Sequence, residues 1–297
     1  MPTAIKTYQI GDVSVVKIEE KIIKPVPSGY LFPTLNASEY HSNIANLSAD
    51  DLEGADRDPI LSVHSWLLKT PDHTILIDAA AGNHKERPRN PLFHRQDLPY
   101  LERLAEAGVD PEDVDYVFNT HLHVDHVGWN TRLRDGKWIP TFPNARYVFP
   151  RREQQYYASP ESHNEANIPS EGAYEDSVQP IVDAGLVDYI EAGGGKYLDA
   201  FEFVPTPGHS IGHMSIKMAS HGVEALFAGD LMHHPVQVYM PEMNTIFCEF
   251  AEDAAKSRLR MLDYCAAKGT IYFPMHFPGS SAGYVSRQGG GFAWAYA

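Results

Sequence analysis

The stretch THLHVDHVGWN, residues 120–130, places three histidines and one aspartate within six consecutive positions: His121, His123, Asp125 and His126. It follows GVDPEDVDYVFN, where Pro111 turns the chain into an apolar strand. Imidazole and carboxylate are ligands that first-row divalent ions favour, and a His-x-His pair on an extended loop can point both rings at one ion. Four ligands are more than a single ion comfortably accepts from one turn. The cluster therefore predicts two adjacent metal ions and further ligands elsewhere in the chain.

Three candidates for those ligands lie where other predicted strands end. FVPTPGHS ends a strand at His209, ALFAGDLMHH ends one at Asp230, and IYFPMHFPG ends one at His276. Each lies near a small or bend-forming residue, as a backbone that turns at a site requires. Loops beyond strand ends are held by a rigid scaffold and still face solvent, so they are suitable places for chemistry.

The rest of the chain alternates between strand and helix patterns. DVSVVKIEE, ILSVHSWLLKT and HTILIDA have β-branched residues at roughly period two, and the turn PDH predicts that the last two pair antiparallel. Helices are predicted for LPYLERLAEAGV, RREQQYYASP and AEDAAKSRLRMLDYCAAKG. Further strands are predicted for ARYVFP, LVDYIEA, FEFVPT, HMSIKMA, VEALFAGD and TIYFP. This order indicates an α/β fold, an αββα sandwich with two mixed sheets flanked by helices.

Length and composition are those of an ordinary globular protein. The 297 residues are 43% hydrophobic and 21% charged, and we expect a single domain over residues 1–297. Residues 24–58 are rich in Pro, Ser, Asn and Asp, and we expect an irregular segment that serves as a lid or an oligomer contact. Residues 159–180 are also polar, and we expect them to be irregular.

The net charge and the absence of long apolar runs limit the classes of partner that we expect the chain to bind. The net charge of −15 disfavours nucleic acid, although a bound cation can reverse the sign locally. The start MPTAIKTYQIGDVSVV lacks a secretory apolar region, and no run of about 20 apolar residues occurs, so we expect no membrane contact and a cytoplasmic location. Cys248 and Cys265, both in a stretch expected to be helical, predict buried thiols.

The series His-x-His-x-Asp-His, a TPGH histidine, a GD aspartate and a late histidine resembles the ligand series of the metallo-β-lactamase superfamily. The resemblance runs from HTILIDA to MHFPG. It implies the fold of that family, a first metal at His121, His123 and His209, and a second at Asp125, His126 and His276, with Asp230 as the bridge. It also implies a hydroxide between two ions about 3.5 to 4 Å apart that attacks a carbonyl or phosphoryl centre.

The resemblance also suggests supporting residues. Asp78 in ILIDA resembles the buried aspartate that orients metal ligands in this family, and the alternative is a turn-forming residue. His213, four residues after His209, is either a structural hydrogen-bonding residue or, like Asp78, a residue that supports the metal ligands. The candidate pocket residues, each also a candidate for the core, are Trp129, Phe93, Tyr239 and Met240.

Within the family, the chain looks closest to the branch of N-acyl homoserine lactone lactonases and methyl-parathion-type hydrolases. Only 297 − 276 = 21 residues follow His276, and Asp230 rather than a cysteine is at the bridging position, which disfavours glyoxalase II and cysteine-ligand β-lactamases. In one set of lactonases a tyrosine lies three residues after the bridging aspartate, where this chain has His233. A histidine there is more like the phosphotriesterases, although it could donate to a carbonyl or protonate an alkoxide.

The resulting prediction is a metal-dependent, quorum-quenching type hydrolase that opens a lactone or related ester, with Asp125, Asp230 and His233 as the candidate catalytic residues. Phosphotriester or aryl ester hydrolysis is the alternative within the same chemistry. The alternative from another functional class is a metal-binding module without catalytic activity. The cofactors are two divalent ions, for which zinc is favoured over Mn, Fe or Co. The partner is a small-molecule ester, and a homodimer is compatible with the segment at 24–58.

Overall fold

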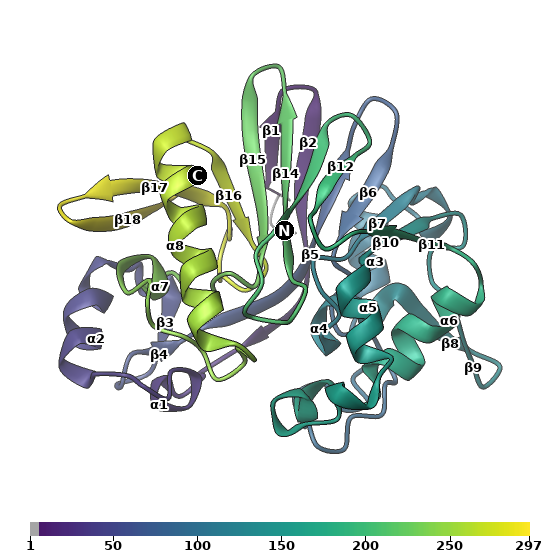
Figure 1. The fold of residues 1–297 in the computed structure, drawn as a ribbon, viewed down its shortest axis with the longest axis horizontal. Coiled ribbons are helices and arrows are strands. Elements are labelled where there is room, and N and C mark those ends of the chain that lie inside the picture. Colours follow the sequence, from purple (N-terminus) through teal and green to yellow (C-terminus); the bar gives the residue numbers. More distant parts are fainter. Residues whose placement is uncertain (1–5) are drawn as a thin grey trace. The chain divides into compact units, whose positions relative to one another are not determined.

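The structure, a computed structural model, describes residues 6–297, and these residues form two compact units. The first unit contains the described chain up to Lys21 together with Val63–Gly195, and the second contains Ile22–Ser62 and Lys196–Ala297. Each unit is built on its own seven-stranded sheet (Figure 1). The expectation that the chain has no secretory leader concerned residues 1–16. Of these, residues 1–5 lie outside the described residues.

The sheet of the first unit is mixed. Its strands, in spatial order, are β1 (Thr7–Ile10), β2 (Val13–Ile23), β5 (Leu61–Lys69), β6 (Thr74–Ile77), β7 (Tyr116–Phe118), β10 (Arg146–Pro150) and β11 (Val187–Ile190). β6, β7, β10 and β11 run parallel, whereas β1 with β2 and β5 with β6 are antiparallel. The antiparallel pair predicted around the turn PDH is therefore confirmed. All of β5 except its last residue is buried, so this strand is covered on both faces.

Helices and one hairpin complete the first unit. They are α3 (Tyr100–Glu106), α4 (Val124–Val127), β8 (Thr131–Arg134), β9 (Lys137–Pro140), α5 (Arg151–Tyr157) and α6 (Gln179–Asp183). Short 3-10 turns cover Pro111–Asp113, Gly128–Asn130, Pro160–Ser162 and Glu165–Ser170, and Tyr174–Val178 forms a π-helical turn. Residues 159–180, which we expected to be irregular, are therefore mostly helical, because side chains such as Ser159 and Asn164 cap successive short turns.

The sheet of the second unit is antiparallel except at one pair. Its strands, in spatial order, are β12 (Gly195–Tyr197), β13 (Phe201–Pro205), β14 (Met214–Ser220), β15 (Val223–Gly229), β16 (Ile271–Pro274), β17 (Gly283–Gln288) and β18 (Gly291–Tyr296). β15 and β16 run parallel, joined by a crossover that contains α7 (Val236–Tyr239) and the long helix α8 (Ala251–Lys268). Figure 1 shows α8, in yellow-green, running past β16 and β17.

The amphipathic pattern of α8 explains how it packs. Its buried positions recur at three- and four-residue spacing and are Ala254, Ser257, Arg258, Met261, Leu262 and Cys265. The helix ends at Gly269, whose φ of 66° is the left-handed conformation that glycine adopts without steric cost. Cys265 is buried within this helix, and burial raises the pKa of its thiol to about 12. Cys248, which we expected in the helix, precedes it.

The segment 24–58 is more ordered than its composition predicts. It contains α1 (Ser28–Leu31), α2 (Ala37–Asn43), 3-10 turns at Ile44–Asn46 and Ala49–Asp51, and the hairpin of β3 (Leu52–Glu53) and β4 (Asp58–Pro59). Asn36 caps α2 by accepting from two backbone N–H groups, and the buried Tyr40 belongs to a core cluster with Leu31 and Phe32. Local capping and isolated aromatics thus order a segment without apolar periodicity. Its role as lid or oligomer contact stays a prediction.

The predicted fold class is confirmed, because the chain forms two mixed sheets with flanking helices. The helices predicted at 98–109, 151–160 and 251–269 and the strands predicted between them are all present. Among residues 6–297, no helix combines the length and apolar character that a bilayer crossing needs.

Candidate metal centre

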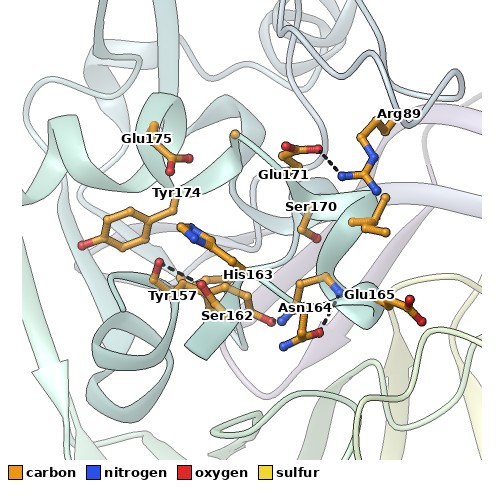
Figure 2. A pocket seen from close by; sticks show the side chains of 14 residues that line it. Arg89, Tyr157, Ser162, His163, Asn164, Glu165, Ser170, Glu171, Tyr174 and Glu175 are labelled. Carbon is orange, nitrogen blue, oxygen red and sulfur yellow. Dashed lines mark hydrogen bonds and ion pairs between the residues drawn. The ribbon is translucent and has the colours of Figure 1, made fainter. Parts of the chain in front are cut away.

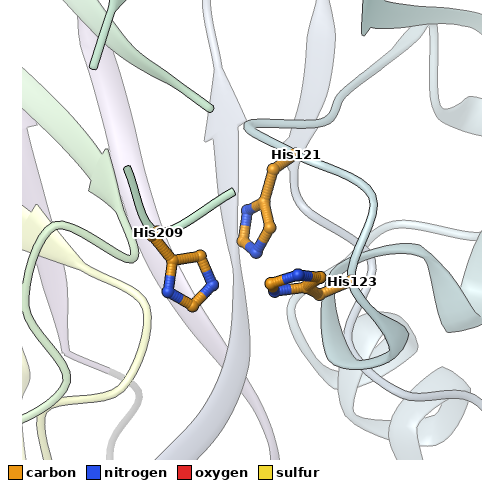
Figure 3. Close-up of side chains that lie close together, drawn as sticks. All are labelled: His121, His123 and His209. Atoms are coloured by element: carbon orange, nitrogen blue, oxygen red, sulfur yellow. The ribbon is translucent and has the colours of Figure 1, made fainter. Parts of the chain in front are cut away.

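In the first unit, the turn after β7 brings three imidazoles together. His121 and His126 are fully buried, and His123 is 9% exposed. The ring centroids of His121 and His123 are 4.6 Å apart, and those of His121 and His126 are 4.0 Å apart. Figure 3 shows the rings of His121 and His123 projecting from this turn. Asp125 follows on α4, with an oxygen 3.8 Å from Nε2 of His126. The four residues singled out in the sequence therefore share one small volume.

Asp78, at the end of β6, holds this turn in place. Its carboxylate is fully buried and accepts hydrogen bonds from the backbone N–H and the hydroxyl of Thr120, both at 2.8 Å. It also accepts from Nδ1 of His126 at 2.9 Å, which leaves Nε2 of that ring as the ligand atom. The same Thr120 hydroxyl lies 3.0 Å from Nδ1 of His121. These are the contacts expected of a carboxylate that orients metal-binding imidazoles.

An Asp78→Asn substitution should lower zinc affinity and kcat/KM by about 10- to 100-fold, because an amide turns an N–H₂ toward the Thr120 donors and loosens His126. Asparagine tolerates the φ of 57° at this position, so the fold should persist. Competition with a chelator measures the zinc affinity, and the exposed Asp72→Asn is the matched control. Equal zinc affinity and turnover in the two variants would contradict this role of Asp78.

Trp129 is packed into the core, and its role as a pocket wall stays a prediction. It is 5% exposed, its ring stacks on that of Tyr100 at 5.2 Å, and its Nε1 donates to Glu20 at 2.7 Å. The Glu20 carboxylate also accepts from the backbone N–H groups of Ala81 and Gly82, and burial raises its pKa. Trp129 thus anchors the end of the turn at residues 120–130, called the ligand turn below, to the core. The sequence does not reveal this role, because Glu20 lies 109 positions away.

In the second unit, three imidazoles surround the carboxylate of Asp230. One of its oxygens, Oδ2, lies 3.1 Å from Nε2 of His276 and 3.2 Å from Nε2 of both His209 and His233. All four residues are at most 4% exposed. Ligand atoms of His209, Asp230 and His233 lie within 4.8 Å of one another, a spacing that a metal ion can span. Figure 3 also labels His209, which follows β13.

The second set of ligands is held by its own hydrogen bonds. Nδ1 of His276 donates to the Ser62 carbonyl at 2.9 Å, so Nε2 is the atom that points toward Asp230. His213 is fully buried, and its Nε2 accepts the backbone N–H of Asp230 at 2.9 Å, while its Nδ1 lies 2.8 Å from the Thr206 hydroxyl. His213 therefore positions the backbone of Asp230, one of the two roles predicted for it.

His233 lies among the ligands rather than in solvent. Its ring stacks on that of His276 with a centroid distance of 5.2 Å and an interplanar angle of 3°. Its backbone N–H donates to Gln237 at 2.7 Å, and its Nδ1 lies 3.4 Å from the Thr245 hydroxyl. Burial lowers its pKa, against the opposing effect of the Asp230 carboxylate. The neighbouring His234 bonds the Asp51 carbonyl and is a packed residue.

The other candidate pocket residues pack against neighbouring groups. Phe93 is 5% exposed with the Lys21 ammonium 5.8 Å from its ring, and Met240 is 7% exposed within the core cluster of Tyr40. Tyr239 is half-buried, and its hydroxyl is 3.4 Å from the Trp294 carbonyl. Substrate contact by these three residues stays a prediction.

The donor set of each unit fits a divalent metal. The groups are buried imidazoles and carboxylates, and His126 and His276 each use the second ring nitrogen to donate to a fixed oxygen. That arrangement sets the tautomer of a metal-binding histidine and raises its basicity. Neutral imidazole nitrogens with carboxylate oxygens are ligands that zinc and its neighbours accept.

Comparisons with known proteins identify a family and several relatives. The profile described as Metallo-beta-lactamase superfamily matches residues 58–276. N-acyl homoserine lactonase AttM of Azorhizobium caulinodans is 28% identical over 200 residues, covering 61% of this chain and 68% of the relative. N-acyl homoserine lactonase AiiA of Bacillus thuringiensis subsp. kurstaki is 25% identical over 167 residues, covering 52% and 58%.

Two solved structures share the fold. The crystal structure of hydrolase AbOPH in the beta lactamase superfamily superposes with a TM-score of 0.84 at 23% identity and covers 100% of this chain and 98% of that one. AidC, described as a dizinc quorum-quenching lactonase in complex with a product, N-hexnoyl-L-homoserine, superposes with a TM-score of 0.79 at 20% identity and covers 99% and 97%.

Proposed function

The chain belongs to the metallo-β-lactamase superfamily, and from that premise we propose that it binds two divalent metal ions and opens a lactone or a related ester. That it is a metal-dependent hydrolase follows from the family and from relatives that are named as hydrolases. The observation that carries the proposal is the Asp230 carboxylate, to which three buried imidazoles present Nε2 within 3.2 Å.

The proposed ligand sets are those that the family resemblance implies. His121, His123 and His209 would hold one ion, Asp125, His126 and His276 would hold the other, and Asp230 would bind both. Zinc is the metal we expect, since this donor set suits it. When bound, two such ions generate a nucleophile from water near neutral pH and polarise the carbonyl.

The residues of the chain supply orientation and hydrogen bonds to this chemistry. Asp78 fixes the ring of His126, and His213 fixes the backbone of Asp230. His233 would donate a hydrogen bond to the substrate oxygen or protonate the departing alkoxide, with the Thr245 hydroxyl 3.4 Å from its Nδ1. Asp125 is the remaining candidate for proton transfer, because its carboxylate is the most exposed of the predicted ligands.

The lactone substrate is supported by the names of the relatives AttM and AiiA, which are N-acyl homoserine lactonases. Quorum quenching, a cytoplasmic location and a homodimer are part of the same proposal. Hydrolysis of aryl esters or phosphotriesters is the second candidate, and the observation that favours it is the histidine at position 233, where one set of lactonases has a tyrosine.

A substrate panel on zinc-loaded protein tests the two candidates. We would measure kcat/KM for N-acyl homoserine lactones of several chain lengths, for 4-nitrophenyl acetate and for an organophosphate triester. The proposal predicts zinc-dependent opening of lactones with kcat/KM at least about tenfold above that for the triester, a difference of about 1.4 kcal/mol in activation free energy. A preference for the triester and the nitrophenyl ester would replace the proposed substrate class.

A further inference from the structure

Arg258, on helix α8 of the second unit, is a buried cation that contacts uncharged groups. Other arginines of the chain pair with acids: Arg89, beside a cavity of about 630 Å³ in the first unit, is exposed and lies 3.3 Å from Glu171 (Figure 2). The buried Arg87 lies 2.7 Å from the carboxylate of Asp176. Arg258 is 1% exposed, yet it donates hydrogen bonds to four uncharged oxygens. Because burial of a charge costs free energy, a functional reason for this arrangement is expected.

The sequence pattern of α8 makes the same position stand out. The residues four before and three and four after Arg258 are Ala254, Met261 and Leu262, and all three are apolar and buried. An apolar residue at position 258 would continue this face of the helix without the cost of burying a charge. Residues that break the pattern of their own element are expected mainly at functional sites.

The four acceptors lie at the two ends of one segment, residues 231–244, which follows Asp230. They are the Leu231 carbonyl, 2.7 Å from Nε of Arg258, the Pro241 and Met243 carbonyls, 2.6 and 3.0 Å from Nη1, and Oδ1 of Asn244, 3.0 Å from Nη2. A guanidinium holds its donors in one rigid plane. One side chain on a long helix therefore fixes both ends of this segment.

His233 lies within that segment, and Gln237 links its backbone to Arg258. Gln237 is fully buried, and its Oε1 accepts the backbone N–H of His233 at 2.7 Å. Its Nε2 donates to the Met243 carbonyl at 2.8 Å, and this carbonyl also accepts from Arg258. A continuous series of hydrogen bonds thus runs from the helix to the backbone of His233.

A second series of contacts reaches the ring of His233. Asn244, which accepts from Arg258, precedes the buried Thr245, whose hydroxyl lies 3.4 Å from Nδ1 of His233. Nε2 of the same ring lies 3.2 Å from the carboxylate of Asp230. A displacement of the segment would therefore move Nε2 relative to that carboxylate.

We infer that Arg258, with Gln237 as its link, is a positioning residue that holds His233 where its Nε2 can act on the substrate. The inference rests on the proposed function, in which His233 donates a hydrogen bond to the substrate oxygen or protonates the alkoxide. Arg258 and Gln237 act through His233 rather than by contact with the substrate. A misplacement of about 1 Å in a reacting group can cost on the order of 100-fold in rate.

Double-mutant cycles on zinc-loaded protein test whether Arg258 acts through His233. Arg258→Lys keeps the charge but loses the planar set of donors, and Gln237→Met keeps a similar volume but loses both hydrogen bonds. Each should lower kcat/KM for the best ester of the substrate panel by at least about tenfold when His233 is present, and by less than about twofold in a His233→Ala background. The zinc content should remain that of the wild-type protein.

The control is Arg287→Lys, the same change at an exposed residue of the second unit, and it should leave kcat/KM unchanged in both backgrounds. If Arg258→Lys does not fold, Gln237→Met still supplies the cycle. An equal loss of kcat/KM with and without His233 would mean that the two residues only support the fold, and it would overturn the inference.

NMR of metal-free protein labelled with ¹³C at histidine Cε1 separates this inference from the proposed function. At one fixed pH, the signal of His233 is the one missing from the spectrum of His233→Ala. The inference predicts that this signal shifts in Arg258→Lys and Gln237→Met but not in Arg287→Lys. If it shifts but no ester is hydrolysed with zinc present, the proposed function fails and the positioning of His233 stands. If esters are hydrolysed and the signal is unchanged in both variants, the inference fails and the proposed function stands.

Discussion

An Asp230→Ala protein is expected to lose its bound metal and to show kcat/KM lower by on the order of 10³-fold, because metal ions contribute several kcal/mol to such reactions. The carboxylate accounts for this effect, since it is the group on which Nε2 of His209, His233 and His276 converge within 3.2 Å. Its removal leaves the three imidazoles without the negative charge that would offset the charge of bound divalent ions. The loss should therefore appear in metal content as well as in rate.

The measurement combines elemental analysis of the purified variant with kcat/KM on a lactone and on 4-nitrophenyl acetate. Asp199→Ala is the matched control, because Asp199 is exposed in the loop before β13 and the same charge is lost. The control should retain the metal content and the rate of the wild-type protein. Wild-type turnover by an Asp230→Ala protein that had lost its metal would contradict the assigned role of this carboxylate.

A Gly128→Ala substitution is expected to destabilise the fold by more than about 4 kcal/mol, at the upper end of what single substitutions do. A Cβ on Gly128 would lie 1.9 Å from the carbonyl carbon and oxygen of Ala81, and both are backbone atoms that cannot turn aside. The backbones approach so closely because the N–H of Gly128 donates to the Ala80 carbonyl at 2.7 Å. This contact docks the ligand turn onto the loop that carries Asp78.

Urea unfolding measures the loss of stability, and zinc content reports whether the ligand turn is displaced. The control is Gly29→Ala, where a Cβ meets no atom within 4 Å and the glycine lies in helix α1, so the change should be small and favourable if anything. A Gly128→Ala protein within about 1 kcal/mol of the wild type and with its full zinc content would show that the close approach is not required.

The positions of the candidate ligands at strand ends could be predicted from the sequence because the strands before them have a clear local pattern. β7, β15 and β16 are apolar and almost fully buried, and a short turn with polar residues comes directly after each of them. Such a pattern depends on neighbouring residues only, so it is visible without the fold. The resemblance to a family then supplied the order in which the ligands were assigned to two ions.

The features that the sequence did not reveal depend on residues far apart in the chain. The role of Trp129 requires Glu20, 109 positions away, and the environment of His233 requires Thr245, 12 positions away. The short helices at 24–58 are ordered by caps and by a core that includes Val236 and Met240. The β17–β18 hairpin was not predicted, although the pair Gly289 and Gly290 is a local sequence signal for a turn between two strands.

The central claim is that two metal ions make this chain a hydrolase, and titration of the metal-free protein with zinc tests it most directly. The protein would be stripped with a chelator, and lactone or ester hydrolysis would be followed as zinc is added in measured equivalents. The proposed ligand sets predict that activity is absent without metal and reaches its maximum at two equivalents per chain. Full activity in protein that has been shown to contain no metal would contradict the account.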